Sequence, residues 1–229
     1  TGAKINRRIV RVVMKLETTD KGKYRYLMLK EIMEQKETLR LAVHQDDKEI
    51  KQIAEMINKA YGTFAVGCGG AGYASMIGEY LFAKVARKHI NFVLASEFGS
   101  HEPFLTSRTL ILITSQSGET ADVLEAMEAG LRKKARIVSL VNVRESSIAK
   151  KSHHTLYLNV GPEKAVASTK ATTAHIALHI LLAYAAADRL GEGKQLLINA
   201  EGYVNDMLNP RYEEHLKKLA KKLYKVQDI

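Results

Sequence analysis

The fold is decided by residues 109–120, which read TLILITSQSGET. The continuous apolar run from Thr109 to Ile113 is typical of a strand that is buried on both faces of a parallel sheet. Three hydroxyl side chains and a glycine follow within residues 115–120, and apolar residues then recur at helical spacing from Ala121 to Leu131. The segment therefore predicts a strand, a polar turn and a helix in succession.

Similar apolar runs precede and follow this one at intervals that leave room for a helix between most of them. They are Phe64–Val66, Ile90–Leu94, Ile137–Val141 and Thr155–Leu158. Strands that alternate with helical patterns form βαβ units, so the chain is predicted to be an α/β protein with a five-stranded parallel sheet.

Helices are also expected on both sides of this region. One spans Tyr26 to about Val43, and Asp46-Asp47 caps the next; a long helix runs from about Thr169 to Leu190, with Gly191 as its C-cap. Two further helices are predicted near Lys194–Leu208 and Glu213–Lys225, and Arg8–Met14 is expected to be a strand or an extended connector.

Composition limits the class of protein. The chain has 229 residues, of which 46% are hydrophobic and 26% are charged, which excludes a disordered or collagen-like chain. A single cysteine cannot form an internal disulfide. The net charge of +10 is spread along the chain without a run of like charges, so we expect no nucleic-acid partner. No signal peptide is recognised, and the most apolar stretch, Ile176–Ala187, is too short to cross a bilayer, so we expect a cytoplasmic protein with no membrane partner.

The turn at residues 115–120 is the strongest candidate site. Its hydroxyl side chains lie where a strand meets a helix N-terminus, which presents unpaired N–H groups and a partial positive charge to an anion. The turn contains no lysine, so a monophosphate suits it better than a nucleotide triphosphate. The alternative is that Ser117 or Thr120 merely caps the helix, although three hydroxyls exceed what one cap requires.

Other motifs carry weaker signals. Gly67, Gly69 and Gly72 fit a dinucleotide fingerprint, but the same glycines serve a tight strand-to-helix turn. Ser168 or Thr169 either caps the long helix or faces a ligand, and the sequence favours neither. His175 and His179 have the spacing of two metal ligands but no third ligand, and nothing beside Cys68 makes it a nucleophile. We therefore expect no metal and no cofactor.

Four segments together resemble one family. The segment KGKYRYLMLKEIMEQ (residues 21–35), ASEF (95–98), SQSGETAD (115–122) and VASTKA (166–171) are similar, in order and spacing, to the isomerase half of glutamine–fructose-6-phosphate aminotransferases, and specifically to its first sugar-isomerase (SIS) domain. This resemblance implies a SIS-type five-stranded parallel sheet flanked by helices, with extra N- and C-terminal helices. It also displaces the dinucleotide interpretation of the glycines.

The resemblance implies a binding site for a sugar phosphate, fructose 6-phosphate or glucosamine 6-phosphate. Carried over residue by residue, the substrate contacts fall on Ser115, Gln116, Ser117, Thr120, Val166, Ala167, Ser168, Gly70 and Ala71. The last two depart from the family, which has Thr and Ser there. No catalytic residue is assigned, because the family's acid–base Glu, ring-opening His and Schiff-base Lys belong to a second SIS domain and tail.

The same resemblance implies a division of the chain. Residues 1–20 would be a connector or the trailing edge of a missing glutaminase domain, 21–60 the N-terminal helices of the isomerase half, 61–208 the SIS domain, and 209–229 a linker helix toward the missing second SIS domain. A homodimer is expected, since SIS domains usually pair through helices. The segment alone is expected to be inactive.

Two alternatives remain open at this point. One is a non-catalytic sugar-phosphate sensor that regulates a partner. The other is a stand-alone phosphosugar isomerase, for which Glu97, Glu119 and His101 are the available acid–base candidates.

Overall fold

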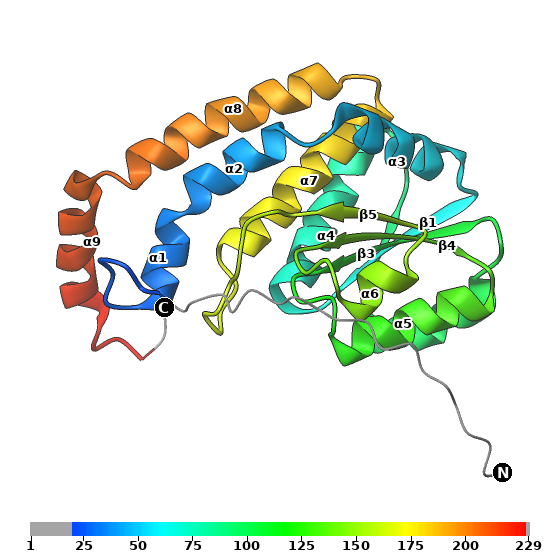
Figure 1. Cartoon of the computed structure of the whole chain (residues 1–229), viewed down its shortest axis with the longest axis horizontal. Helices are drawn as coiled ribbons and strands as arrows, with labels where there is room; N and C mark the ends of the chain where they lie inside the picture. Colours follow the sequence, from blue (N-terminus) through cyan, green and yellow to red (C-terminus); the bar gives the residue numbers. More distant parts are fainter. Residues whose placement is uncertain (1–19, 228–229) are drawn as a thin grey trace, which may run out of the picture.

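The computed structural model describes residues 20–227, so the strand or connector expected at Arg8–Met14 lies outside the described residues. Within them the chain forms a parallel sheet with the strand order β2-β1-β3-β4-β5 (Figure 1). The strands are β1 (Gly62–Gly67), β2 (Asn91–Leu94), β3 (Thr109–Ser115), β4 (Arg136–Val141) and β5 (His154–Tyr157). The predicted α/β class and all five predicted strands are confirmed.

The position of strand β3 in the sheet explains its continuous apolar sequence. Leu110 and Leu112 point into one core cluster and Ile111 and Ile113 into another, and all four are at most 1% exposed. The first face is covered by α3 (Asp47–Lys59), α4 (Gly69–Leu81) and α7 (Lys170–Ala186), and the second by α5 (Ala121–Arg132), α6 (Ser147–Lys151) and the 3₁₀ segment Ala95–Phe104. The central strand is therefore buried on both sides.

The strand order reverses between β1 and β3. From β1 the chain moves outward to β2 and then returns to the other side of β1, where Gly67 pairs with Thr114 at the carboxyl ends. Ligands of open α/β sheets bind at such a switch point, outside the carboxyl ends of the strands. The topology therefore brings the segment after β1 and the turn after β3 to the same edge of the sheet.

The glycines after β1 serve close packing. A Cβ atom at Gly67 would lie 3.0 Å from the backbone nitrogen of Gly72, and one at Gly72 would lie 3.0 Å from the carbonyl oxygen of Gly67. Gly69 has a φ of +53°, in the left-handed region. The tight-turn interpretation of this motif thus accounts for all three glycines.

The helices before the sheet differ from the sequence prediction in one respect. Instead of one helix from Tyr26, the structure has α1 (Leu27–Met33) and α2 (Gln35–Val43), with a break at Glu34. The side-chain amide of Gln35 donates to the carbonyl of Ile32 (3.1 Å), which satisfies an acceptor that the break exposes. The predicted cap of the next helix is confirmed, since Asp46 accepts from the N–H of Lys48.

The predicted C-cap at Gly191 is wrong. Helix α7 ends at Ala186, Asp188 takes the left-handed conformation (φ +57°), and the N–H of Arg189 returns to the carbonyl of Tyr184 (2.8 Å). Aspartate tolerates this conformation better than most residues, so no glycine is required for the turn. Gly191 instead lies in the first turn of α8 (Leu190–Met207), which begins about four residues before the predicted start.

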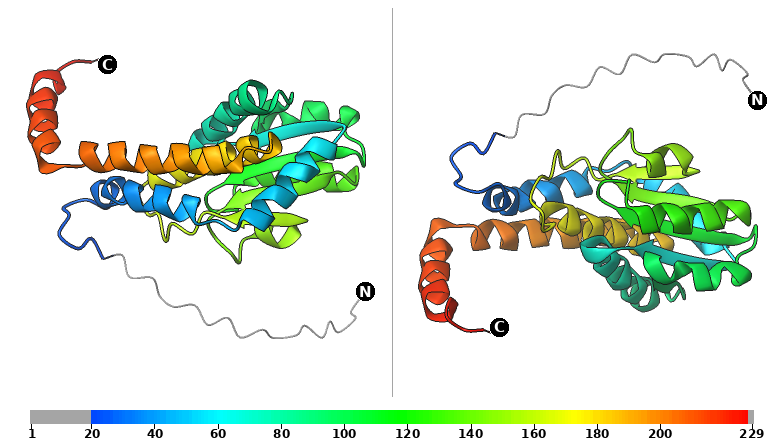
Figure 2. Two further views of the ribbon diagram at one scale, coloured as in Figure 1. Left: turned by 90° about the horizontal axis from the view of Figure 1, so that it is seen from above. Right: turned by 90° about the horizontal axis from the view of Figure 1, so that it is seen from below.

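Helix α8 runs alongside α2 and extends beyond the sheet, and α9 (Pro210–Leu223) turns away at its end (Figure 2). By contrast, α7 packs against both α2 and α8, and most of its side chains are buried against the rest of the chain. Helix α7 is therefore a core helix, and it is not available as an interface in the described structure.

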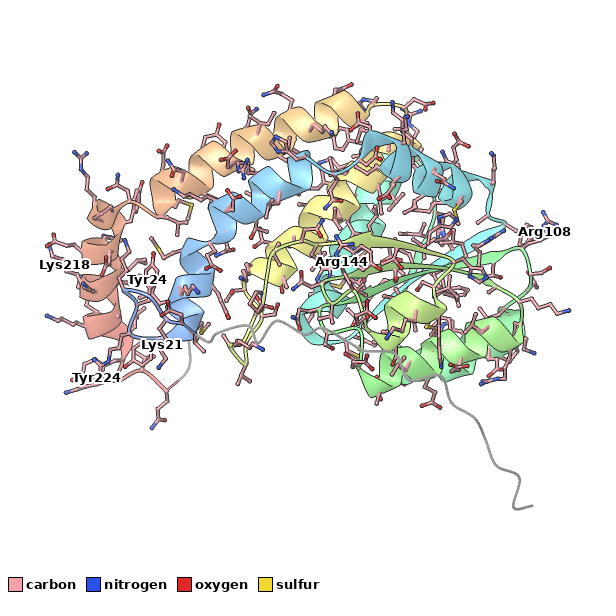
Figure 3. The ribbon with its side chains drawn as sticks, in the orientation of Figure 1. Lys21, Tyr24, Arg108, Arg144, Lys218 and Tyr224 are labelled. Carbon is pink, nitrogen blue, oxygen red and sulfur yellow. The ribbon has the colours of Figure 1, made fainter. Side chains whose placement is uncertain are left out.

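Positive charge is dispersed over the fold. Lys21 and Lys218 lie at the α9 end of the molecule, whereas Arg108 lies at the opposite end of the sheet (Figure 3). Several basic residues are also paired locally, as Lys217 is with Glu213 (2.7 Å). In residues 20–227, no helix combines the length and the apolarity that crossing a membrane requires.

Candidate functional site

A pocket opens at the switch point between β1 and β3. It is lined by residues that follow β1, residues of the turn after β3, and one residue before α7: Cys68, Gly70, Ala71, Thr114, Ser115, Gln116, Ser117, Thr120 and Ser168. The fold thus brings together seven of the nine residues singled out from the sequence. Val166 and Ala167 are exposed on the neighbouring loop and do not line the pocket.

The turn after β3 holds its hydroxyl groups in a defined pattern. Gly118 has a φ of +66°, and its N–H donates to Oγ of Ser115 (3.1 Å). The N–H of Glu119 donates to Oγ of Ser117 (3.2 Å). Because Ser117 accepts this bond, its own hydroxyl proton is left to donate to a ligand in the pocket.

The turn leads into α5, whose N-terminus is open toward the pocket. Thr120 occupies the N-cap position with an extended backbone, but its side chain makes no capping hydrogen bond. Its Oγ1 lies 3.4 Å from Oγ of Ser115 instead. The cap interpretation therefore does not explain Thr120. The first N–H groups of α5 have no intrahelical acceptor and carry the positive end of the helix dipole.

The N-terminus of α7, on the other side of the pocket, is already occupied by a carboxylate of the same chain. Oε1 of Glu163 accepts from the N–H groups of Thr169 (2.8 Å) and Ala171 (3.1 Å), and Oε2 accepts from Oγ of Ser168 (2.9 Å). Thr169 lies at the N-cap position but makes no side-chain cap, and its hydroxyl also donates to Glu163 (3.2 Å). Glu163 thus satisfies the groups that a ligand anion would need at α7.

The two departures from the family, Gly70 and Ala71, border the pocket beside Ser168. A Cβ atom at Gly70 would lie 2.7 Å from Oγ1 of Thr172, and this hydroxyl donates to Oγ of Ser168 (3.0 Å). The side chain of Thr172 therefore occupies part of the space that a residue larger than glycine would take at position 70.

Sequence reasoning missed three residues of this region. Thr114 follows the predicted strand and was given no role, nothing beside Cys68 marked it as a pocket residue, and Glu163 has no local signal because it acts on groups five to eight residues later. The half-buried Cys68 thiol lies 3.9 Å from Oδ2 of Asp122. Burial, and secondly the charge of Asp122, raise the pKa of Cys68, so the thiol is protonated at neutral pH and is a poor nucleophile.

The histidine pair His175 and His179 lies inside the core. Both side chains are at most 1% exposed. Nε2 of His179 lies 3.2 Å from Oγ1 of Thr114, which also accepts from Oγ of Ser75 (2.8 Å). Among the described residues, no group of three or more His, Cys, Asp or Glu side chains is arranged to hold a metal ion. The pair therefore has a structural place, with one hydrogen bond that supports the strand beneath the pocket.

Burial gives these two histidines a pH-dependent effect on stability. Burial, and secondly the charge of His179, lower the pKa of His175 to about 3, and burial lowers the pKa of His179 to about 4. In the unfolded chain both groups bind protons near pH 6.5, so the unfolded state takes up protons first as the pH falls. We expect the free energy of unfolding to drop between pH 6.5 and pH 5, with each histidine contributing at most about 1.4 kcal/mol per pH unit.

Urea denaturation across this pH range measures the effect, with the variant His175→Leu as the comparison. Removing one of the two titrating groups should flatten the decrease in the variant. Identical slopes for the two proteins would contradict a neutral, buried His175.

The acid–base candidates for a stand-alone isomerase make their contacts outside the pocket. Oε1 of Glu119 accepts from the N–H of Ser147 (2.7 Å), a bond that lowers the pKa of Glu119. The His101 ring stacks on Phe98 at 6.2 Å, and Glu97 is on the same 3₁₀ segment. None of these three residues lines the pocket.

Comparison with known proteins agrees with this arrangement. The SIS domain family matches residues 56–185. The chain is 37% identical to a glutamine–fructose-6-phosphate aminotransferase (isomerizing) from Clostridium tetani, over the whole chain and 40% of the relative. It is 35% identical to the enzyme of that name from Pyrococcus horikoshii, over 80% of the chain and 31% of the relative. The chain therefore spans less than half the length of these curated relatives.

A solved structure gives the same result for the fold. The C-terminal domain of glucosamine-fructose-6-phosphate aminotransferase from Francisella tularensis superposes with a TM-score of 0.77 and 25% identity, over 89% of this chain and 61% of that one. On the family match, the strand order and the position of the pocket, this chain belongs to the SIS domain family.

Proposed function

We propose that the pocket binds a hexose 6-phosphate, fructose 6-phosphate or glucosamine 6-phosphate, and that the chain is the first SIS unit of a glutamine-dependent hexosephosphate aminotransferase. The observation that carries this proposal is the contrast between two helix N-termini at one pocket. The N-terminus of α5 is open and surrounded by Ser115, Ser117 and Thr120, whereas that of α7 is filled by Glu163. Of these two N-termini, that of α5 is the one open to an anionic group.

The phosphate belongs at α5 for electrostatic reasons. Hydroxyl donors and backbone N–H groups at the positive end of a helix dipole stabilise a phosphate without a lysine or a metal ion. The carboxylate of Glu163 would repel a phosphate on the opposite side. The sugar would therefore extend from α5 toward Gly70, Ala71 and Ser168, with Val166 and Ala167 as further contacts from the loop.

The rest of the reaction is assigned to other parts of a longer protein. We propose that residues 21–60 and 61–208 form the N-terminal helices and SIS domain of the isomerase half, between the connector 1–20 and the linker helix 209–229. Glutamine hydrolysis and the isomerisation of the sugar would then depend on a glutaminase domain and a second SIS domain. Pairing of two chains, and a location in the cytoplasm, are part of the same proposal.

The chemistry of the pocket supports a binding role for this segment. Its lining in the described structure consists of glycine, alanine, hydroxyl and amide side chains and a protonated thiol, so it offers no carboxylate or imidazole to move a proton. The segment would hold the phosphate and so orient a substrate whose proton transfers occur elsewhere.

Calorimetric titration of the chain with fructose 6-phosphate, and with fructose as the matched ligand without phosphate, tests this function. We expect binding of the phosphorylated sugar only, and no glucosamine 6-phosphate when ammonia is added. Equal binding of both sugars would contradict the phosphate site, and formation of glucosamine 6-phosphate would contradict the division of labour.

A further inference from the structure

The loop that carries Ser168 is held by a buried carboxylate from a distant helix. Glu31 on α1 is 3% exposed. Its Oε1 accepts from the N–H groups of Lys164 (2.6 Å) and Ala165 (3.2 Å), and its Oε2 lies 3.3 Å from the latter nitrogen. Among the residues described, Glu31 forms no ion pair, so these loop amides are what satisfies its charge.

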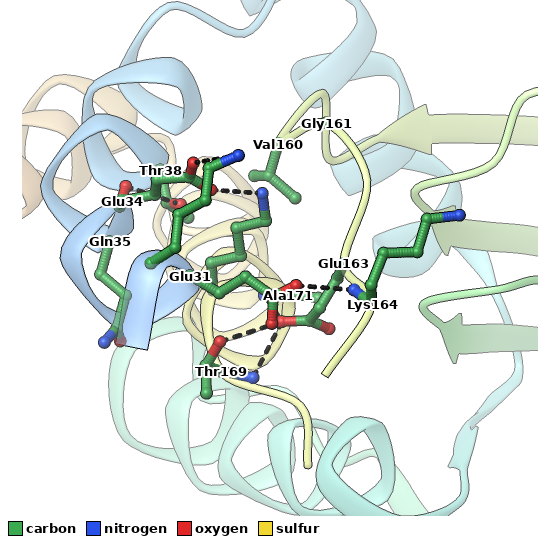
Figure 4. Close-up of polar contacts among 12 residues, drawn as sticks. Glu31, Glu34, Gln35, Thr38, Val160, Gly161, Glu163, Lys164, Thr169 and Ala171 are labelled. Atoms are coloured by element: carbon green, nitrogen blue, oxygen red, sulfur yellow. Dashed lines mark hydrogen bonds and ion pairs between the residues drawn. The ribbon is translucent and has the colours of Figure 1, made fainter. Parts of the chain in front are cut away.

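Neighbouring side chains of the α1–α2 junction contact the residues that follow Ser168 in the chain. Oε2 of Glu34 pairs with Nζ of Lys170 (2.6 Å), a lysine that is 3% exposed. Oε1 of Gln35 accepts from Oγ1 of Thr173 (2.6 Å). Figure 4 shows Glu31 and Glu34 on the side of the α1–α2 junction that faces the start of α7 and the strand-to-helix loop before it. The junction therefore contacts the chain both before and after Ser168.

Apart from Glu31, the loop is held by polar contacts at the start of α7 and not by apolar burial. Lys164, Val166, Ala167 and Ser168 are exposed, so little apolar burial fixes their positions. Within the loop, Glu163 accepts the Ser168 hydroxyl and orients this side chain. Glu31 in turn fixes the two residues that follow Glu163.

We propose that Glu31 is a positioning residue for the pocket: it holds the loop 163–168 so that Ser168 faces the sugar end of the ligand. This inference rests on the proposed function. Helix α1 lies before residue 56, where the SIS family match begins, so the site is completed by a segment outside the matched domain. The role of α1 concerns the sugar end only, because the turn at 115–120 has its own supports.

The full chain tests this with Glu31→Ala, Glu31→Gln and Ser168→Ala. Glu55→Ala is the matched control, since Glu55 is an exposed helical glutamate whose ion pair in the described part of the chain is with Lys59. The probes are fructose 6-phosphate and inorganic phosphate. We expect Glu31→Ala to weaken fructose 6-phosphate binding about tenfold, the effect of losing hydrogen bonds to a charged group. Inorganic phosphate should bind as in the wild type.

Two comparisons separate positioning from a general loss of structure. Glu31→Gln retains Oε1, which accepts the two shorter bonds, so it should recover most of the affinity. If Glu31 acts through Ser168, adding Glu31→Ala to Ser168→Ala should cause little further loss. The proposal would be overturned if Glu31→Ala bound fructose 6-phosphate as tightly as Glu55→Ala does. It would also be overturned if Glu31→Ala lost the same affinity for fructose 6-phosphate and for inorganic phosphate.

Amide hydrogen exchange tests the contact between Glu31 and the loop without any ligand, so it applies even if the wild type binds no sugar phosphate and the proposed function fails. In Glu31→Ala the amides of Lys164 and Ala165 should exchange faster, while those of β3 remain protected as in the wild type. Unchanged exchange at these two amides would overturn the role of Glu31 independently of any ligand.

Discussion

Replacing Gly118 by alanine should lower the free energy of unfolding by about 3 kcal/mol and abolish sugar-phosphate binding. Gly118 has a φ of +66°, which is strained for any residue with a Cβ atom. That atom would also overlap the side chain of Ser146, lying 2.5 Å from its Cβ. Ser146 is fully buried and caps α6, so it has no space in which to move. The strain must therefore displace the turn that carries Ser115, Ser117 and Thr120.

Gly161→Ala is the control for this prediction. Gly161 has a φ of +69°, but an added Cβ would meet nothing within 4 Å. It should show only the conformational strain of about 1 kcal/mol. Urea denaturation measures both variants, and equal losses of stability would show that the contact with Ser146 is not the cause.

Replacing Gly78 by alanine should destabilise the fold by about 2–3 kcal/mol, although alanine is the better helix former by about 1 kcal/mol. At Gly78 helices α4 and α7 approach closely, and a Cβ atom would lie 2.5 Å from Nδ1 and 2.9 Å from Cγ of His179. The His179 ring is buried and lies against Thr114, so it cannot swing away without breaking that hydrogen bond.

The same substitution at Gly202 should have the opposite sign. Gly202 is exposed within α8, and an added Cβ would meet nothing within 4 Å. Gly202→Ala should therefore raise the free energy of unfolding by up to about 1 kcal/mol through helix propensity alone. A Gly78→Ala variant as stable as the wild type in urea would contradict the close packing of α4 on α7.

The sequence allowed the sheet to be predicted because its signals are local. The strand from Thr109 is continuously apolar, since both of its faces are buried, and the turn after it has the composition of an anion site. The position of the pocket follows from the strand order, which places the segments after β1 and β3 side by side. Six of the predicted site residues meet there for this reason, and Ser168 joins them from the loop before α7.

Other features depend on contacts that no local pattern encodes. Glu31 binds amides 133 and 134 residues later in the chain, and its own helix gives no indication of these partners. Likewise, glycine was predicted to end α7, but aspartate adopts the left-handed turn at position 188. Whether Ser168 caps α7 or faces a ligand was undecided from sequence because the deciding group is the side chain of Glu163.

The phosphate site at the N-terminus of α5 is the central claim, and one titration tests it most directly. Fructose 6-phosphate is titrated by calorimetry into the wild type, the double variant Ser117→Ala/Thr120→Ala, and the control Ser100→Ala, which removes an exposed hydroxyl outside the pocket. Loss of two hydroxyl donors to a charged phosphate should weaken binding by more than about tenfold in the double variant, with the control unchanged. Equal affinity in the wild type and the double variant would contradict the assignment of the phosphate to this turn.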